Sequence, residues 1–190
     1  MVYLCIFFAV VAFWQLGLRY HRSQRLEELS ERSMAELSEL KRQLTNRHLI
    51  VSHLADSLPS SFDPKFERQK LREISQTAEA SLSTIDPRKP CADRIRDFMS
   101  KERELVVFTR ELIDSIETDE RFNQALLVTS CIEGLDKANT QIGDRTSIYN
   151  SSAIAHRSLR RTSFLQQRKR HAEFTVFVLE EWNAGNTSRS

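Results

Sequence analysis

The sequence predicts an all-α protein, in which a single N-terminal transmembrane helix continues into the long first helix of an antiparallel bundle of about four helices. Three observations predict this fold class. The 190 residues include only four Gly and four Pro, charged residues make up 28% of the chain, and apolar residues recur among them at helical spacing. The expected organisation is an anchor at residues 1–19, a cytoplasmic helical bundle at 20–182 and a flexible tail at 183–190.

The first 18 residues form an apolar segment without a charged side chain. At about 1.5 Å per helical residue this segment reaches roughly 27 Å, close to the hydrocarbon thickness of a bilayer. Trp14 and Tyr20 lie toward one end, where amphipathic rings favour the headgroup region, and Arg19, Arg22 and Arg25 follow. A cleaved signal peptide is the alternative, but no basic residue precedes the apolar run. The positive-inside rule then predicts an outer N-terminus and a cytoplasmic body.

The rest of the chain is expected to form long helices. Heptad-like apolar spacing from Leu26 to Leu58, interrupted by Arg47, predicts one helix that is continuous with the apolar segment. Asp63 and Pro64 supply a helix start, so a second helix is expected over residues 64–84. The prolines within residues 86–90 predict a loop, and the stripe of apolar residues from 95 to 116 predicts a third helix ending near 118.

A fourth helix is expected from residue 118 or 119 along a stripe that contains Leu135, Ile142 and Tyr149. Gly134 and Gly143 fall inside it, so the helix either packs closely against a neighbour there or breaks at Gly143. The later run Phe-Thr-Val-Phe-Val-Leu at residues 174–179 fits both a helix end and a single strand.

Two segments carry motifs that resemble the LemA family of bacterial membrane proteins. They are Leu135, Asp136, Ala138, Asn139, Ile142, Arg145, Tyr149 and Asn150 on the fourth helix, and Arg47, His48, Ile50, Val51 and Leu54 on the first. The chain departs from the family pattern at residues 49–53, where the family reads Asp-Leu-Ile-Pro-Asn, and at residues 156–157, which replace a second Tyr-Asn pair. The resemblance implies an antiparallel bundle on a single-pass anchor in a bacterial inner membrane. It implies no catalytic residue.

The histidines do not form a metal site by spacing. His48 and His53 are five residues apart, which separates them by about 140° on a helix and keeps them from sharing one ion. His21, His156 and His171 have basic neighbours and are expected at the surface. Neither a metal nor a cofactor is therefore expected.

Catalytic motifs are also absent from the sequence. It has no Gly-rich phosphate loop, no HExxH motif and no nucleophile elbow, so an enzyme is not expected. The three cysteines, at positions 5, 91 and 131, show neither zinc spacing nor a CxxC pair and are expected to be packing residues. Tyr149 and Asn150 could contact a ligand, but the Tyr is more simply a core residue whose hydroxyl reaches a polar neighbour.

The stretch between Arg145 and His171 is basic and contains no Asp or Glu. Its candidate binding residues are Arg157, Arg160, Arg161, Arg168, Lys169 and Arg170. On an anchored protein this patch could bind anionic lipid headgroups or an acidic partner, and a solvated basic face is the alternative. Nucleic acid is not expected, because the net charge is only +2 and aromatic residues are not interleaved for stacking.

These observations favour a membrane-anchored helical interaction or scaffold protein that acts through an unidentified protein partner. The alternative is a transmembrane signalling or sensory coiled-coil protein, in which the continuous stalk transmits a displacement. The sequence leaves the oligomeric state open.

Overall fold

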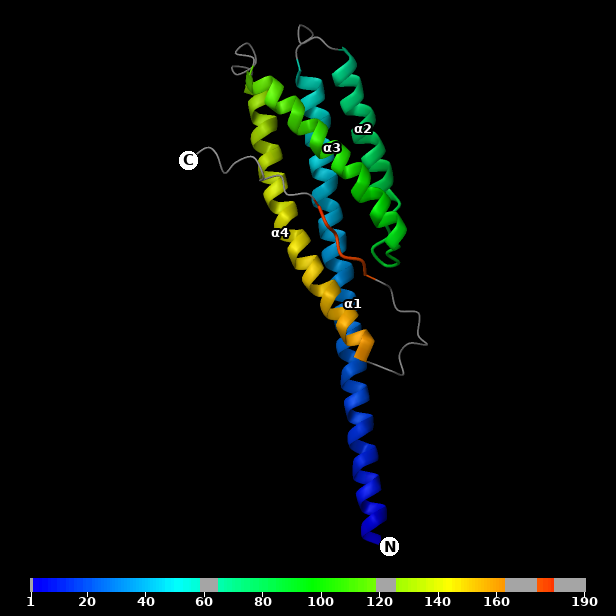
Figure 1. Ribbon diagram of the computed structural model, residues 1–190. Coiled ribbons are helices and arrows are strands. Elements are labelled where there is room, and N and C mark those ends of the chain that lie inside the picture. The colour runs from blue at the N-terminus through cyan, green and yellow to red at the C-terminus, as the bar shows by residue number, and fades with distance from the viewer. Residues whose placement is uncertain (1, 59–64, 119–125, 163–173, 180–190) are drawn as a thin grey trace.

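The computed structural model describes residues 2–58, 65–118, 126–162 and 174–179. Within these ranges the chain is all-α and forms the helices α1 (Val2–Ser57), α2 (Lys65–Ser83), α3 (Ala92–Thr118) and α4 (Leu126–Thr162). They alternate in direction from one to the next (Figure 1). The predicted all-α class and helical bundle are confirmed. The predicted cap at residues 63–64, the start of the fourth helix at 119 and the tail at 183–190 lie outside the described residues.

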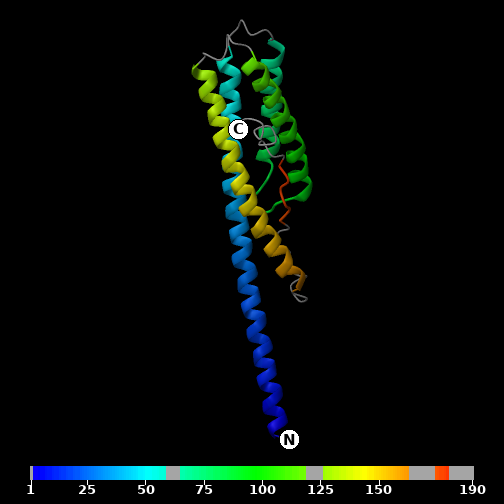
Figure 2. The ribbon, with the colours of Figure 1, turned by 60° about the vertical axis from the view of Figure 1, so that its left-hand side comes forward.

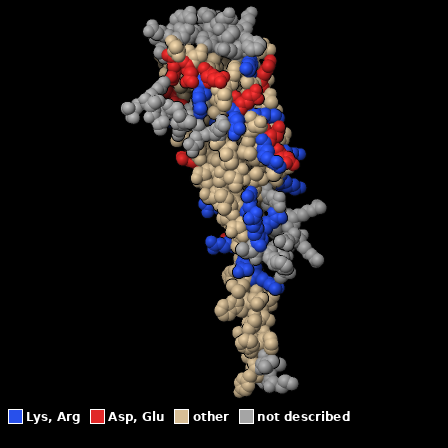
Figure 3. All heavy atoms as spheres, in the orientation of Figure 1, with Lys and Arg blue, Asp and Glu red and all other residues tan. Residues whose placement is uncertain are grey.

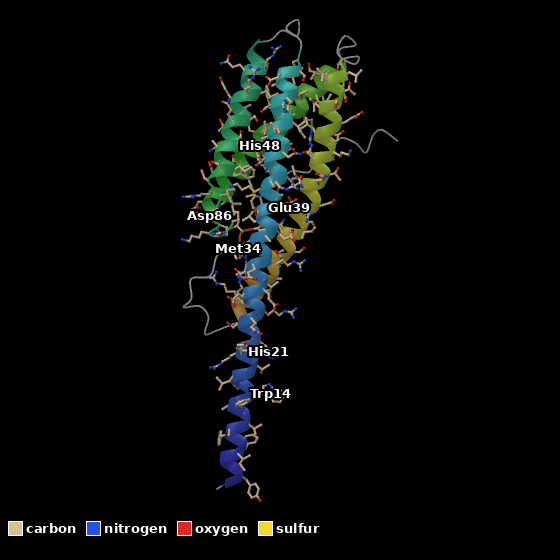
Figure 4. All side chains as sticks on the ribbon, turned by 180° about the vertical axis from the view of Figure 1, so that it is seen from behind. Trp14, His21, Met34, Glu39, His48 and Asp86 are labelled. Atoms are coloured by element: carbon tan, nitrogen blue, oxygen red, sulfur yellow. The ribbon has the colours of Figure 1, made fainter. Side chains whose placement is uncertain are left out.

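Helix α1 is continuous over 56 residues, which corresponds to about 84 Å. Its N-terminal part projects well beyond the other helices (Figures 1 and 2). Trp14 and His21 lie on this projecting part, whereas His48 lies within the bundle (Figure 4). The prediction of one helix that runs from the apolar segment into the bundle is therefore confirmed.

The surroundings of α1 change along its length. Every described side chain between residues 3 and 22 is exposed, and this group includes large apolar side chains such as Phe7, Phe13 and Trp14. Leu26 is the first fully buried residue, and Leu37, Leu40 and Leu44 continue the buried seam. Over the described residues, no helix combines the length and the apolar character needed to cross a bilayer. The transmembrane part of the predicted fold therefore stays a prediction.

Helices α1 and α4 form a long antiparallel pair with one consistent register. The Oγ atoms of Ser33 and Ser152 lie 2.9 Å apart. Further along the pair, Arg47 donates to Asn139, and a Cβ at Gly134 would lie 3.7 Å from Ile50. At Gly134 this is an ordinary van der Waals distance, and a Cβ at Gly143 would have nothing within 4 Å, so the predicted close packing against a neighbouring helix is found at neither glycine. Helix α4 also continues through residue 143, so the alternative of a break there is wrong.

Helices α2 and α3 form a hairpin beside α1. The loop predicted at residues 86–90 lies between them, and Ser81 of α2 donates to Asp97 of α3 at 2.7 Å. Lys41 of α1 donates through Nζ to the carbonyl of Ile85 at 2.8 Å. This carbonyl follows the end of α2 and has no partner within the helix, so the lysine satisfies it.

The apolar core is divided into two clusters along the bundle axis. The proximal cluster, nearer the projecting end, includes Leu37, Leu40, Leu44, Phe98, Ile142 and Tyr149. The distal cluster includes Val51, Leu54, Leu58, Leu105, Leu112 and Leu135. On α1, α3 and α4 alike, buried polar side chains lie between the two clusters, and these side chains form the candidate site.

Candidate functional site

A buried polar layer joins three helices between the apolar clusters. It consists of Arg47 and His48 from α1, Glu102 from α3 and Asn139 from α4, each exposed by 8% or less. Arg47 forms an ion pair with Glu102 through Nη2 and donates through Nη1 to Asn139 Oδ1 at 2.8 Å. His48 Nε2 lies 2.8 Å from the other oxygen of Glu102. One carboxylate therefore serves two neighbouring α1 side chains.

Burial sets the charge states in this layer. It lowers the pKa of Arg47 to about 10, so the guanidinium is still charged at neutral pH. Burial and then the positive charge of Arg47 lower the pKa of His48 to about 3. The imidazole is therefore neutral at pH 7, and its Nε2 carries the proton that it donates to Glu102. The layer holds one ion pair and one neutral donor.

The space beside the layer is very small. A cavity of about 10 Å³ is lined by side chains of the layer and its neighbours, among them Arg47, Met99, Glu102, Val178 and Leu179. That is about the smallest cavity that can hold one water molecule. Among the described residues, no group of three or more His, Cys, Asp or Glu side chains could hold a metal ion. This geometry favours a structural role for the polar layer.

The segment 174–179 covers the layer and is neither a helix nor a paired strand, so both options left open by the sequence are wrong. It runs as an extended trace along the bundle (Figure 1). Asn150 binds the main chain of Phe177 twice, accepting from its N–H at 2.8 Å and donating to its carbonyl at 2.7 Å. Tyr149 donates to the carbonyl of Thr175, and Arg157 to that of Phe174, both at 2.9 Å.

Two aromatic side chains anchor this segment. The Phe177 ring packs edge-on against Tyr149, with 5.4 Å between ring centroids, and also contacts Phe98 of α3 at 6.3 Å. The Phe174 ring packs edge-on against His156 at 5.0 Å. Both phenylalanines are buried in the proximal cluster. A groove formed by α3 and α4 thus holds the segment by its main chain and by two rings.

The structure brings most of the family-motif residues together on the α1–α4 seam. Leu54, Leu135 and Ile142 are buried in the two core clusters. Arg145 lies 3.6 Å from Glu36 of α1 in a partly exposed ion pair. Tyr149 is fully buried, and its hydroxyl reaches a carbonyl, as predicted. Asn150 has a more specific role than expected, because it binds the segment that follows α4.

Glu102 and His156 are the residues that sequence reasoning missed. The prediction that His156 lies at the surface is wrong, because it is 1% exposed and packs on Phe174. Glu102 was hidden within a charged run, between Lys101 and Arg103. The available signal was spacing, since Glu102 lies four residues after Phe98 and three before Leu105 on the apolar stripe of α3.

The other histidines and the cysteines follow the predictions only in part. His53 and His21 are exposed, so His48 and His53 face different surroundings, as their spacing predicted. Cys131 is partly buried, but Cys91 is exposed, so its expected packing role is wrong. Cys91 lies immediately before α3, and the backbone N–H groups of Arg94 and Asp93 lower the pKa of its thiol.

Basic residues gather where the bundle meets the projecting part of α1. The α1–α4 register places Arg160 and Arg161 level with Arg25 of α1, and Arg157 one turn further into the bundle. Basic side chains lie along the lower body in Figure 3, immediately above an end that is almost free of charge. The candidate residues Arg168, Lys169 and Arg170 lie outside the described residues. Arg19, Arg22, Arg25, Arg157, Arg160 and Arg161 are called the basic collar below.

Comparison with known proteins finds no matching family model, no similar curated protein and no similar solved structure. The resemblance to the LemA family is thus neither supported nor contradicted by relatives.

Removal of the Glu102 charge should unfold the bundle more easily. In Glu102→Gln, Arg47 stays buried without a counter-charge, which costs about 3–5 kcal/mol in the free energy of unfolding. Urea unfolding of the full-length chain in detergent measures this change. Glu104→Gln is the control, because Glu104 is exposed on the same helix and should change stability by less than about 0.5 kcal/mol. A loss below 1 kcal/mol in Glu102→Gln would contradict a central role for the ion pair.

The neutral His48 should make stability depend on pH. The unfolded histidine binds a proton near pH 6.5, whereas the folded one binds it only near pH 3. Between these values the unfolded state holds more protons, so stability is full above pH 6.5 and decreases as pH falls. The decrease due to His48 from pH 7 to pH 5 is about 2 kcal/mol.

The His48→Gln variant should lack this part of the pH dependence. Urea unfolding at pH 7 and pH 5 gives the decrease in the free energy of unfolding for wild type and for each variant. The contribution of His48 is the difference between the decreases in wild type and in His48→Gln. His53→Gln is the matched control, because His53 is exposed on the same helix. Equal decreases in wild type and His48→Gln would show that the folded His48 takes up a proton as readily as the unfolded one.

Proposed function

We propose that this protein is a membrane-anchored helical interaction module, which a single N-terminal helix holds at a bacterial inner membrane with its bundle in the cytoplasm. The observation that carries the proposal is the exposed apolar end of α1, which is continuous with a buried bundle helix. The proposed anchor is the sequence segment 1–19, which includes residues 1, 2, 4 and 5, whose side chains lie outside the described set. The resemblance of the seam residues to the LemA family agrees with this arrangement.

Hydrocarbon is the surrounding that best fits the projecting end. Its exposed apolar side chains lie all around the helix, from Tyr3 and Phe7 to Leu16 and Leu18. A helix that is apolar all round is matched by lipid rather than by one partner surface. Each large apolar side chain gains roughly 1.5–3 kcal/mol when it leaves water, so insertion of the segment gains on the order of 10–20 kcal/mol.

The basic collar supports both the orientation and a contact with lipid headgroups. Arg19, Arg22 and Arg25 directly follow the apolar segment, and positive residues beside a span are retained on the cytoplasmic side. Arg160 and Arg161 lie at the same level from α4. Each basic residue near an anionic surface contributes on the order of 1 kcal/mol. The collar would therefore hold the base of the bundle against the membrane.

Cell fractionation with thiol labelling tests the anchor and its orientation. The variant Cys5→Ser with Cys131→Ser retains Cys91, whose exposed thiol is a natural reporter on the bundle. We expect the full-length variant in the membrane fraction, with Cys91 protected from an impermeant maleimide in intact cells and labelled after permeabilisation. A version that begins at Arg19 is the control and should be soluble. Labelling of Cys91 in intact cells would show that the bundle lies on the outer side of the membrane. A soluble full-length chain would show that the N-terminal segment is not an anchor.

Charge reversal in the collar should weaken binding to anionic lipid. In the version that begins at Arg19, Arg160→Glu with Arg161→Glu should lower the affinity for phosphatidylglycerol vesicles roughly ten-fold or more, because two attractions become repulsions. Vesicle co-sedimentation measures the affinity. Lys70→Glu with Lys137→Glu is the matched control, because it changes the net charge equally on exposed residues away from the collar. If both pairs lower the affinity equally, the collar has no special contact with lipid.

A further inference from the structure

The groove that holds residues 174–179 recognises the main chain of its occupant. Its walls are Phe98 and Met99 of α3 and Tyr149, Asn150, His156 and Arg157 of α4, and these six residues are called the segment groove. The hydrogen bonds from Tyr149, Asn150 and Arg157 end on backbone atoms of the segment. The sulfur of Met99 likewise accepts from the backbone N–H of Val178 at 3.3 Å. Such contacts are available to any extended peptide, whatever its side chains.

Side-chain selectivity in the segment groove is confined to two positions. Phe174 and Phe177, three residues apart, are both buried against aromatic rings of the groove walls. Thr175 and Val176 between them are only partly buried, and the Val178 side chain is 70% exposed. The groove therefore reads aromatic side chains at positions i and i+3 and accepts varied residues elsewhere.

The walls of the segment groove are positioned by contacts that do not involve the segment. Helix α4 is aligned on α1 by Ser33–Ser152 and Arg145–Glu36, and α3 is joined to α1 by the Glu102 ion pair. The segment belongs to none of the four helices. An equivalent peptide from another molecule would therefore meet the same donors, acceptor and rings.

We propose that the segment groove is a binding site for an extended segment of a partner protein with uncharged residues and aromatic side chains at positions i and i+3. The chain's own residues 174–179 occupy this site and compete with the partner. This inference rests on the proposed interaction role and names the chemistry of the partner. Because the competitor belongs to the same chain, it binds the groove intramolecularly, and the partner binds tightly only when the chain's own segment is displaced.

Binding of a synthetic peptide to the full-length chain in detergent tests the proposal. The probe is a fluorescent peptide with residues 174–179 between two pairs of added lysines, and fluorescence anisotropy measures its affinity. Phe174→Ser with Phe177→Ser weakens the internal competitor and leaves the wall residues of the groove unchanged. We expect this variant to bind the probe at least about ten-fold more tightly than wild type does, because the tethered segment no longer competes. A probe with both phenylalanines replaced by serine should not bind.

Substitutions in the groove localise the binding. Adding Asn150→Ala to the weakened chain removes both amide contacts and should lower probe affinity by at least about ten-fold. Adding Gln141→Ala is the control, because Gln141 is exposed on the same helix, and it should leave the affinity unchanged. Far-UV circular dichroism and urea unfolding verify that each variant is folded.

Three results would overturn the proposal. The first is equal probe affinity for wild type and the weakened chain, and the second is unchanged affinity on Asn150→Ala in a folded protein. The third is co-purification of wild-type chains with weakened chains in a complex that the probe cannot dissociate. That result would show that the segment groove is occupied by residues 174–179 of a second copy. The titration in detergent does not depend on membrane insertion, so its failure is distinct from failure of the proposed anchor.

Discussion

The constraint on which the rest of this structure depends is the continuity of α1 across two surroundings. The helix is exposed and apolar around Phe7 and Phe13, and about a dozen residues after Trp14 it becomes the buried seam of a bundle. A continuous helix between them couples their orientation, because each residue adds a fixed rotation and rise. The direction of the projecting end therefore sets where the α1–α4 pair, the basic collar and the segment groove stand. One helix therefore fixes the positions of all three features relative to one another.

The buried layer of Arg47, His48, Glu102 and Asn139 specifies how the helices meet. A purely apolar seam would tolerate a slip between helices, whereas a buried polar residue in a coiled coil fixes register at a cost in stability. Here any slip of α4 along α1 would separate Arg47 from Asn139, and a slip of α3 would leave the guanidinium without its carboxylate. Desolvation of the charges costs free energy, so the layer adds little net stability. Its hydrogen bonds and ion pair nevertheless allow only one register of the helices. The same register places Asn150 and Tyr149 where they bind the segment 174–179.

Helical periodicity was enough to predict the four described helices and the loop after α2, because each depends on spacing within one segment. It also marked Arg47 as an interruption of the seam and Tyr149 as a core residue with a bonded hydroxyl. It did not identify Glu102 as the partner of Arg47, since the two residues lie on different helices and Glu102 sits among other charged residues. The conformation of residues 174–179 could not be chosen locally either, because side chains of α3 and α4 hold its main chain. His156 had basic neighbours in the sequence, yet packing against Phe174 buries it.

The depth of Trp14 tests most directly whether the projecting end of α1 lies in lipid. Trp182→Phe leaves Trp14 as the only tryptophan in the full-length chain, which can be reconstituted into vesicles whose acyl chains are brominated. A membrane location of this end predicts that these lipids strongly quench Trp14 fluorescence and that aqueous iodide quenches it little, because the ring then lies within or at the edge of the hydrocarbon. Quenching by iodide without quenching by brominated lipid would contradict it, and would place the apolar end of α1 against protein or water instead.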